Sequence, residues 1–165
     1  RITSWLKDNT PDTHPHTLVH GDYKLDNVMF GTGTPPEIAS IFDWELSSLG
    51  DPLTDLGWML SFWWDEKDPA PPEPTGDLYP TFMRQEEYLT RQELVNRYEE
   101  LTGHTFEHQK FYRVLAVHKL TALGEMFFRR YLEDNSDDPL YPLMEEGVIE
   151  MAERSVRIIE GDEPL

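Results

Sequence analysis

The apolar residues of this 165-residue chain change their spacing near residue 50. Before that point they form short runs, "TLVH" from residue 17, "NVMF" from residue 27 and "EIASIFD" from residue 37, each ending at or beside a Gly or Asp. Such runs are typical of β-strands. Beyond residue 50, apolar residues recur at intervals of three and four, which predicts amphipathic helices. This order favours an α+β fold, with a small β unit over residues 17–43 followed by a mostly helical subdomain.

Capping signals indicate where two of the helices begin. Asp51 at an N-cap position and Pro52 at the first helical position open a helix in "GDPLTDLGWMLSFWW". Thr90 and Glu93 have the spacing of a capping box, and Gly103 is suited to end the helix that follows. The Pro-rich, acidic stretch "DEKDPAPPEPTGD" between these helices is expected to be a surface loop.

Three further helical segments are predicted from apolar spacing. The first nine residues resemble the end of a helix, and a last helix is expected from about Pro142 to Ile159. Thr105 is expected to cap a long helix that runs to about Leu132. The residues expected on its buried face are Phe111, Leu115, His118, Ala122, Met126 and Phe127.

The charge and cysteine content limit the partners and the compartment. Lys+Arg is 14 and Asp+Glu is 32, which gives a formal net charge of −18 and argues against a nucleic acid or an anionic membrane as a partner. The acidic residues are spread along the chain, as in a well-solvated surface or in adaptation to high salt. The sequence has no Cys, no apolar run long enough to span a bilayer, and no signal-peptide pattern. We therefore expect a cytoplasmic protein.

The segment "HGDYKLDN", residues 20–27, places a carboxylate and a carboxamide five residues apart between two predicted strands. Transfer of a phosphoryl group from ATP to a hydroxyl needs a group that accepts the hydroxyl proton and oxygen ligands for magnesium. Asp22, Asn27 and Asp43 follow one another in that order, as base and two metal ligands. Taken alone, Asp22 and Asn27 are better explained as turn residues. The position of Asp43 at the end of the next strand favours the functional interpretation.

Three motifs together resemble the aminoglycoside phosphotransferase and choline kinase superfamily, small-molecule relatives of the protein kinases. They are "HGDYKLDN" at residues 20–27, "IFDWE" at 41–45 and "GDPLTDLGW" at 50–58. The similarity is closest to the kinase domains that are joined to acyl-CoA dehydrogenases. It implies a protein-kinase-like fold that uses ATP and Mg²⁺.

The resemblance also implies roles for individual residues. Asp22 matches the catalytic Asp of the family, and Asn27 and Asp43 match its metal and nucleotide ligands. Lys24 resembles the catalytic-loop Lys of protein kinases, which contacts the γ-phosphate. Glu45 is a candidate ligand for a second magnesium ion.

The nucleotide-binding lobe of such kinases lies before the catalytic loop, and only 19 residues precede His20. A lobe of that kind needs roughly a hundred residues. We therefore expect residues 1–165 to form the C-terminal, catalytic and substrate-binding lobe. The N-terminal kinase lobe would be supplied by the full-length protein, and this chain alone would be inactive.

The resemblance implies a small-molecule hydroxyl as the acceptor, with a hydroxyacyl thioester such as a hydroxyacyl-CoA favoured. The aromatic side chains of Trp58, Trp63 and Trp64 suit an apolar acyl chain, whereas the acidic stretch 65–77 would attract a cation. An aminoglycoside-type or choline-type kinase is therefore an alternative. A kinase-like remnant that acts only as a binding module is another.

Other polar residues of the motif region have structural explanations. His20 is expected to brace the loop backbone, and Asp55 either braces the same loop or stabilises the start of its helix. His14, His16 and His20 have the spacing of a metal site, but Pro15 and the intervening strand argue against one. The tryptophans, Trp44 among them, are expected mainly in the core or in a pocket wall.

Overall fold

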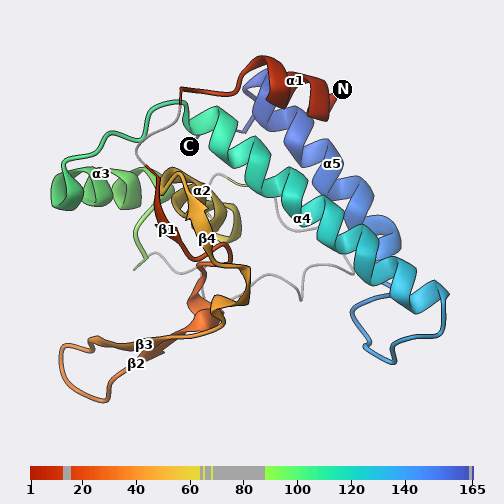
Figure 1. The fold of residues 1–165 in the computed structure, drawn as a ribbon, viewed down its shortest axis with the longest axis horizontal. Helices are drawn as coiled ribbons and strands as arrows, with labels where there is room; N and C mark the ends of the chain where they lie inside the picture. The colour runs from red at the N-terminus through yellow and green to blue at the C-terminus, as the bar shows by residue number, and fades with distance from the viewer. Residues whose placement is uncertain (13–15, 64, 66–67, 69–87, 164) are drawn as a thin grey trace.

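A computed structural model describes residues 1–12, 16–63, 65, 68, 88–163 and 165. After a first helix the chain forms four short strands, and the remaining helices follow and pack mainly against one another (Figure 1). The elements are α1 (Ile2–Asp8), β1 (Thr17–Val19), β2 (Val28–Phe30), β3 (Ile38–Ile41), β4 (Ser48–Gly50), α2 (Leu53–Phe62), α3 (Arg91–Thr102), α4 (Gln109–Leu132) and α5 (Met144–Glu160). The predicted α+β organisation is confirmed.

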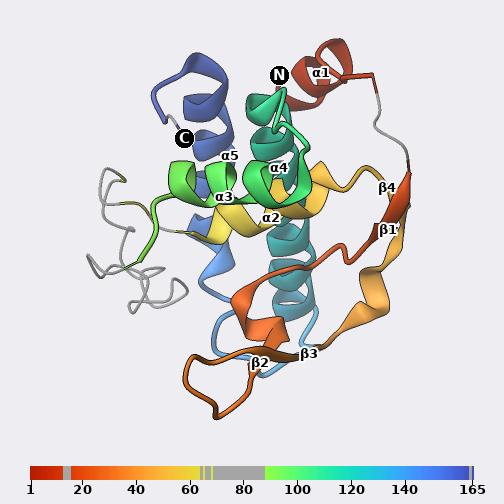
Figure 2. The ribbon, with the colours of Figure 1, turned by 90° about the vertical axis from the view of Figure 1, so that its left-hand side faces the viewer.

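The β unit consists of two antiparallel strand pairs, one nested within the other along the chain. In the outer pair Val19 at the end of β1 lies opposite Ser48 of β4, and in the inner pair Val28 of β2 lies opposite Ile41 of β3. The segments 20–27 and 42–47 therefore both connect the outer pair to the inner pair, and they run side by side. Figure 2 shows the inner pair projecting beyond the helices. The three predicted strands are present, whereas β4 was not predicted because its only apolar residue, Leu49, is 76% exposed.

Helix α4 is the centre of the helical subdomain, and α2, α5 and α1 all pack against it (Figure 1). On one side it forms a core with α5 and α1, and on the other side a core with α2 and α3. The buried residues of the first core are Leu6, Val114, Val117, Met144, Met151 and Ile158, and those of the second are Leu53, Leu56, Leu60, Val95, Phe106 and Tyr112. Within the described residues, no helix combines the length and apolarity needed to cross a membrane.

Two expectations about α4 were wrong. The helix begins at Gln109 rather than just after Thr105, because Phe106 is buried in a core and its N–H donates to Glu99 Oε1 at 2.7 Å, while His108 is left-handed with φ 51°. The buried face that we expected was also too narrow. Helix α4 packs against other helices on two sides, so a wider arc of its surface is buried. Ala122 and Met126 are exposed, and the residues buried instead are Tyr112, Arg113, Val114, Ala116, Val117 and Gly124.

The capping signals of α3 are confirmed, whereas α2 begins at Leu53 with Pro52 as its N-cap, one residue later than predicted. Thr90 and Glu93 form the capping box, and Gly103 ends α3 in the left-handed conformation with φ 72°. The Asp51 carboxylate accepts from the Leu53 N–H at 3.0 Å at the start of α2. Its second oxygen accepts from the buried Tyr112 hydroxyl at 2.6 Å, and burial, followed by this hydrogen bond, raises the pKa of Tyr112.

Arg91, the first residue of α3, connects this helix to the end of α2. The Arg91 guanidinium donates to the Trp63 carbonyl at 3.1 Å and to both oxygens of Asp68. The Arg91 backbone N–H donates to Asp65 Oδ2 at 3.2 Å. Trp63 Nε1 donates in turn to the Leu89 carbonyl at 2.6 Å. Burial raises the pKa of Asp68, but the hydrogen bond and charge of Arg91 outweigh burial, so the pKa of Asp68 is lowered.

The stretch 65–77 was expected to be an exposed acidic loop, but two acidic residues near its start are largely buried. Asp65 is buried and Asp68 is largely so, because both bind Arg91. The remaining residues of this stretch, and Trp64 before it, lie outside the described residues.

Gly57 allows α2 to approach α4 closely. A Cβ at this position would lie 2.8 Å from Tyr112 Cβ and 2.9 Å from the Tyr112 carbonyl oxygen. Backbone atoms cannot move aside as a flexible side chain can, so the two helices would have to separate.

We expect Gly57→Ala to lower the free energy of unfolding by about 1–3 kcal/mol, because overpacking outweighs the gain in helix propensity. Denaturant unfolding followed by tryptophan fluorescence measures the change. Gly33→Ala is the matched control, since the nearest atom to its Cβ would be 3.5 Å away and no left-handed φ is involved. A midpoint shift no larger than that of Gly33→Ala would contradict this account of the α2–α4 contact.

Candidate functional site

The loop from His20 to Asn27 follows β1 and depends on a glycine for its shape. Gly21 has φ +83°, in the left-handed region, and a Cβ there would clash with the Leu46 carbonyl oxygen. His20 is buried, with its ring Nε2 2.7 Å from the Phe42 carbonyl and its Nδ1 accepting from the Asp22 N–H at 3.2 Å. His20 therefore braces the backbone, as predicted.

Asp55 fixes the same loop from the first turn of α2. Its Oδ2 accepts from the His20 N–H at 2.6 Å and its Oδ1 from the Gly21 N–H at 2.8 Å. The two carboxylate oxygens thus accept from two consecutive backbone N–H groups. Of the two roles considered for Asp55, the structure supports the one in which it braces the loop.

The Asp22 carboxylate is held at both oxygens. Oδ1 accepts from Trp58 Nε1 at 2.9 Å and Oδ2 accepts from Asn27 Nδ2 at 2.9 Å. The same Asn27 nitrogen donates to the Asp22 carbonyl at 2.8 Å. A carboxylate has about four acceptor positions, so this arrangement fixes the plane of the group and leaves acceptor positions for a further donor.

Lys24 is the cation of the loop. Its Nζ lies 3.8 Å from Asp22 Oδ2 and 3.8 Å from Asp26 Oδ2. It also lies 5.5 Å from the centre of the Phe62 ring at the end of α2. The structure therefore brings three of the five expected site residues, Asp22, Lys24 and Asn27, into one group.

Asp43 and Glu45 lie on the neighbouring segment that follows β3. The Phe42 N–H donates to the Asn27 carbonyl at 2.8 Å, which places Asp43 one residue from a direct contact with the loop. Asp43 has φ 60° and ψ 58° and starts the turn Trp44–Leu46. The carboxylates of Asp43 and Glu45 are exposed, and neither makes a hydrogen bond with the loop residues within the described part of the chain.

The donor set suits a hard cation. Asn27 uses its amide nitrogen for both hydrogen bonds to Asp22, so its amide oxygen is left for another partner. Asn27 and the exposed Asp43 together offer an amide and a carboxylate oxygen, the ligands that magnesium prefers. Among the described residues no three His, Asp or Glu side chains form a metal-holding group by themselves, and His14 of the considered histidine site lies outside them.

Sequence reasoning missed two contributors to the site, Lys119 and the hydrogen bond of Trp58. Trp58 is buried, as expected for a core residue, but its indole N–H is used by Asp22. Lys119 of α4 donates to the Gly21 carbonyl and lies 4.2 Å from the centre of the Trp58 ring. Burial lowers the pKa of Lys119, and the charges of Asp22 and Asp55 oppose that shift. No local motif marks a lysine that is separated from the loop by almost a hundred residues.

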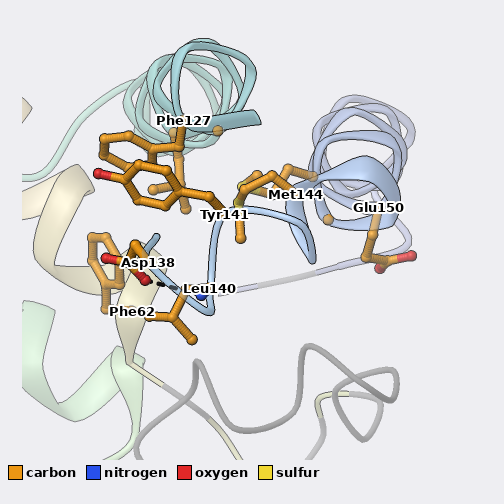
Figure 3. A pocket seen from close by; sticks show the side chains of 11 residues that line it. Phe62, Phe127, Asp138, Leu140, Tyr141, Met144 and Glu150 are labelled. Atoms are coloured by element: carbon orange, nitrogen blue, oxygen red, sulfur yellow. Dashed lines mark hydrogen bonds between the residues drawn. The ribbon is translucent and has the colours of Figure 1, made fainter. Parts of the chain in front are cut away.

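A pocket of about 360 Å³ opens between α4, α5 and the segment that joins them (Figure 3). Phe127 and Tyr141 stack in its wall, with ring centres 4.9 Å apart, and Phe62 faces them from α2. The lining residues are Phe62, Leu120, Gly124, Phe127, Asp138, Leu140, Tyr141, Met144, Gly147, Glu150 and Met151. Trp58 and Trp63 do not line it, so the apolar wall expected from tryptophans is made by other residues.

Phe62 links this pocket to the loop. Its ring contacts the Trp58 ring at a centre-to-centre distance of 5.1 Å, and Trp58 binds Asp22. The two carboxylates of the pocket wall are both engaged: Glu150 pairs with Arg157 at 2.7 Å, and Asp138 accepts from the Leu140 N–H at 2.9 Å. The pocket is thus a mainly apolar space, connected to Asp22 through the Phe62 and Trp58 rings.

A solved structure supports the fold. The chain superposes with a TM-score of 0.71 on a Ralstonia eutropha protein assigned as an aminoglycoside phosphotransferase, with 22% sequence identity. The superposition covers 97% of this chain and 48% of that protein. At this identity the likeness concerns the fold alone.

The sequence comparisons give the family. The APH family model, described as the phosphotransferase enzyme family, matches residues 1–92. Mouse acyl-CoA dehydrogenase family member 11 is 31% identical over 177 residues, which covers 95% of this chain and 21% of that protein. Mouse acyl-CoA dehydrogenase family member 10 is 43% identical over 58 residues, or 35% of this chain and 5% of that protein. The chain therefore belongs to the phosphotransferase enzyme family, and it spans only about a fifth of the length of the first of these relatives.

We expect Asp55→Asn to reduce the free energy of unfolding by about 1–3 kcal/mol, because an amide nitrogen cannot accept and one buried backbone N–H loses its partner. Urea unfolding measures the loss. Asp8→Asn, at an exposed position of α1, is the control and should stay within about 0.5 kcal/mol of the parent protein. Identical midpoints for the two variants would mean that Asp55 does not hold the loop.

Proposed function

We propose that residues 1–165 are the C-terminal, catalytic lobe of an ATP-dependent kinase that phosphorylates a hydroxyl group of a small molecule. The observation that carries this proposal is the Asp22 carboxylate, which Trp58 and Asn27 hold at both oxygens while acceptor positions remain. A carboxylate fixed in this way is suited to orient a hydroxyl and to accept its proton. Membership of the phosphotransferase family supports the same class of reaction.

The other residues of the site receive roles that suit their positions. We assign Asn27 and Asp43 to magnesium and the nucleotide phosphates, Glu45 to a second magnesium ion, and Lys24 to the transferred phosphoryl group. When bound, Mg²⁺ and ATP supply the γ-phosphoryl group and neutralise its negative charge. The chain's own contribution is a fixed orientation of acceptor, base and ligands, which accounts for most catalysis in this reaction class.

The full-length protein is expected to supply an N-terminal lobe that binds the nucleotide, so this chain alone would be inactive. The β unit exposes apolar side chains that suit such a neighbour, with Leu18 61% and Phe30 50% exposed. The structural relative and the mouse proteins are all considerably longer than the part that this chain matches. Those lengths leave room for the proposed lobe.

We favour a hydroxyacyl thioester, such as a hydroxyacyl-CoA, as the acceptor. The apolar pocket, whose wall includes Phe62, is suited to an acyl chain, and its two carboxylates are already engaged. A relative that is named an acyl-CoA dehydrogenase family member adds support from sequence. The net charge of −18 favours the alternative acceptors, a polycationic aminoglycoside or choline.

In the full-length protein, we expect Asp22→Asn to cut phosphoryl transfer by about 100-fold or more while Mg·ATP binding stays nearly intact, because Asp22 serves the acceptor. Asp43→Ala should lose both transfer and Mg·ATP binding. Isothermal titration calorimetry and a rate assay separate these effects. Equal loss of nucleotide binding in both variants would show that the roles are wrongly assigned, and unchanged transfer in both would exclude Asp22 and Asp43 from the reaction. Absence of transfer by the unaltered full-length protein would favour the binding-module alternative.

The acceptor is tested with hydroxyacyl-CoAs of increasing chain length, choline, homoserine and several aminoglycosides, compared by kcat/KM. We expect hydroxyacyl-CoAs to be preferred, and kcat/KM to rise about fourfold per added CH₂ until the pocket is filled, since burying a CH₂ contributes about 0.8 kcal/mol.

Leu140→Gln, which adds a polar group to the pocket wall, should reduce that preference. Leu132→Gln is the matched control, since Leu132 is exposed and outside the pocket. An aminoglycoside that exceeds every hydroxyacyl-CoA by tenfold or more would exclude the acyl acceptor.

A further inference from the structure

Lys119 reaches the loop of Asp22 from the middle of α4. Its ammonium donates to the Gly21 carbonyl and lies over the ring of Trp58, 4.2 Å from the ring centre. These two contacts belong to a side chain that neither the capping pattern nor the kinase-like motifs include. The contact with Gly21 joins residues 98 positions apart in sequence.

The first contact fixes the peptide group that precedes Asp22. The Gly21 carbonyl and the Asp22 N–H belong to the same planar unit. Lys119 binds the carbonyl end, and the Asp22 N–H donates to His20 Nδ1 at 3.2 Å. This peptide plane is therefore held from both ends, and a plane held from both ends sets the direction in which the Asp22 side chain leaves the backbone.

The second contact acts on the Asp22 carboxylate through Trp58. The Trp58 Nε1–H donates to Asp22 Oδ1 at 2.9 Å. A cation over the indole face is attracted by the ring, so it restrains the ring in the position from which it donates. It also places positive charge near the carboxylate, which favours a charge-assisted hydrogen bond to the ionised form.

We propose that Lys119 is a positioning residue that holds Asp22 in its reactive orientation through the Gly21 carbonyl and the Trp58 ring. This inference rests on the proposed function of Asp22 as the group that orients the acceptor hydroxyl. The next residue along α4, Leu120, lines the apolar pocket, so one turn of this helix contacts both the catalytic loop and the acceptor space.

The test compares Lys119→Met and Lys119→Arg in the full-length protein. We expect Lys119→Met to lower kcat by about tenfold or more, because small misplacements of a catalytic group cost up to about 100-fold. The KM for Mg·ATP should change by less than about twofold. Lys119→Arg should recover most of kcat, since a guanidinium both donates to a carbonyl and stacks on an indole.

A second readout does not need activity. Hydrogen–deuterium exchange followed by mass spectrometry should show faster exchange of peptides that contain residues 20–27 in Lys119→Met, and near-parental exchange in Lys119→Arg. Lys110→Met is the control on the same helix, because Lys110 is exposed and binds the Ile159 carbonyl instead of the loop. It should leave kcat and loop exchange unchanged.

The results distinguish a failure of the role proposed for Lys119 from a failure of the proposed function. Parental kcat and parental loop exchange in Lys119→Met would overturn the proposal, and so would an Arg variant as impaired as the Met variant or a Lys110→Met variant with the same losses. If the unaltered protein phosphorylates no acceptor, the proposed function fails. Loop exchange then decides the role of Lys119, with faster exchange in Lys119→Met supporting it and unchanged exchange overturning it.

Discussion

The pair of hydrogen bonds from the His20 and Gly21 amides to Asp55 is the constraint on which the site depends. Asp55, Trp58 and Phe62 lie at helical positions i, i+3 and i+7, so they share one face of α2. Along that face, Asp55 holds the loop backbone, Trp58 holds the Asp22 carboxylate, and Phe62 contacts Lys24 and lines the pocket. One face of a single helix therefore contacts the loop backbone, the Asp22 carboxylate and the apolar pocket. The loop itself contains no regular element longer than one 3₁₀ turn.

The second constraint is the close contact of α2 with α4. The absence of a side chain at Gly57 lets the helices approach, and the Tyr112 hydroxyl binds Asp51 at the start of α2. This contact brings α4 near enough for Lys119 to reach the loop. The peptide group between Gly21 and Asp22 thus depends on packing between helices as well as on its own sequence.

The parts of the fold and site that could be predicted are those with local signals. The motif around Asp22 and Asn27 combines turn residues, a glycine and flanking strands within a few positions, and the structure brings those residues into contact. The capping box before α3 is equally local. Features that depend on tertiary packing were missed: β4 pairs through its backbone with an exposed Leu49, α4 starts late because Phe106 is drawn into the core, and Lys119 is distant in sequence. The pocket was missed for the same reason, since its wall comes from three separate segments.

The hydrogen-bonded contact of Arg91, Trp63 and Leu89 bears on how the length of the chain between α2 and α3 can vary. This contact brings Trp63, the first residue after α2, next to Arg91, the first residue of α3, and Asp65 and Asp68 add to it from the start of the intervening chain. Doubling the length of a flexible connection between two fixed points costs only about 0.6 kcal/mol in closure entropy. A change in the number of residues between Asp68 and Leu89 would therefore cost little in closure entropy as long as Arg91 keeps its partners. The relative position of α2 and α3 would survive such a change, because the contacts of Arg91 fix it and the length of the connection does not.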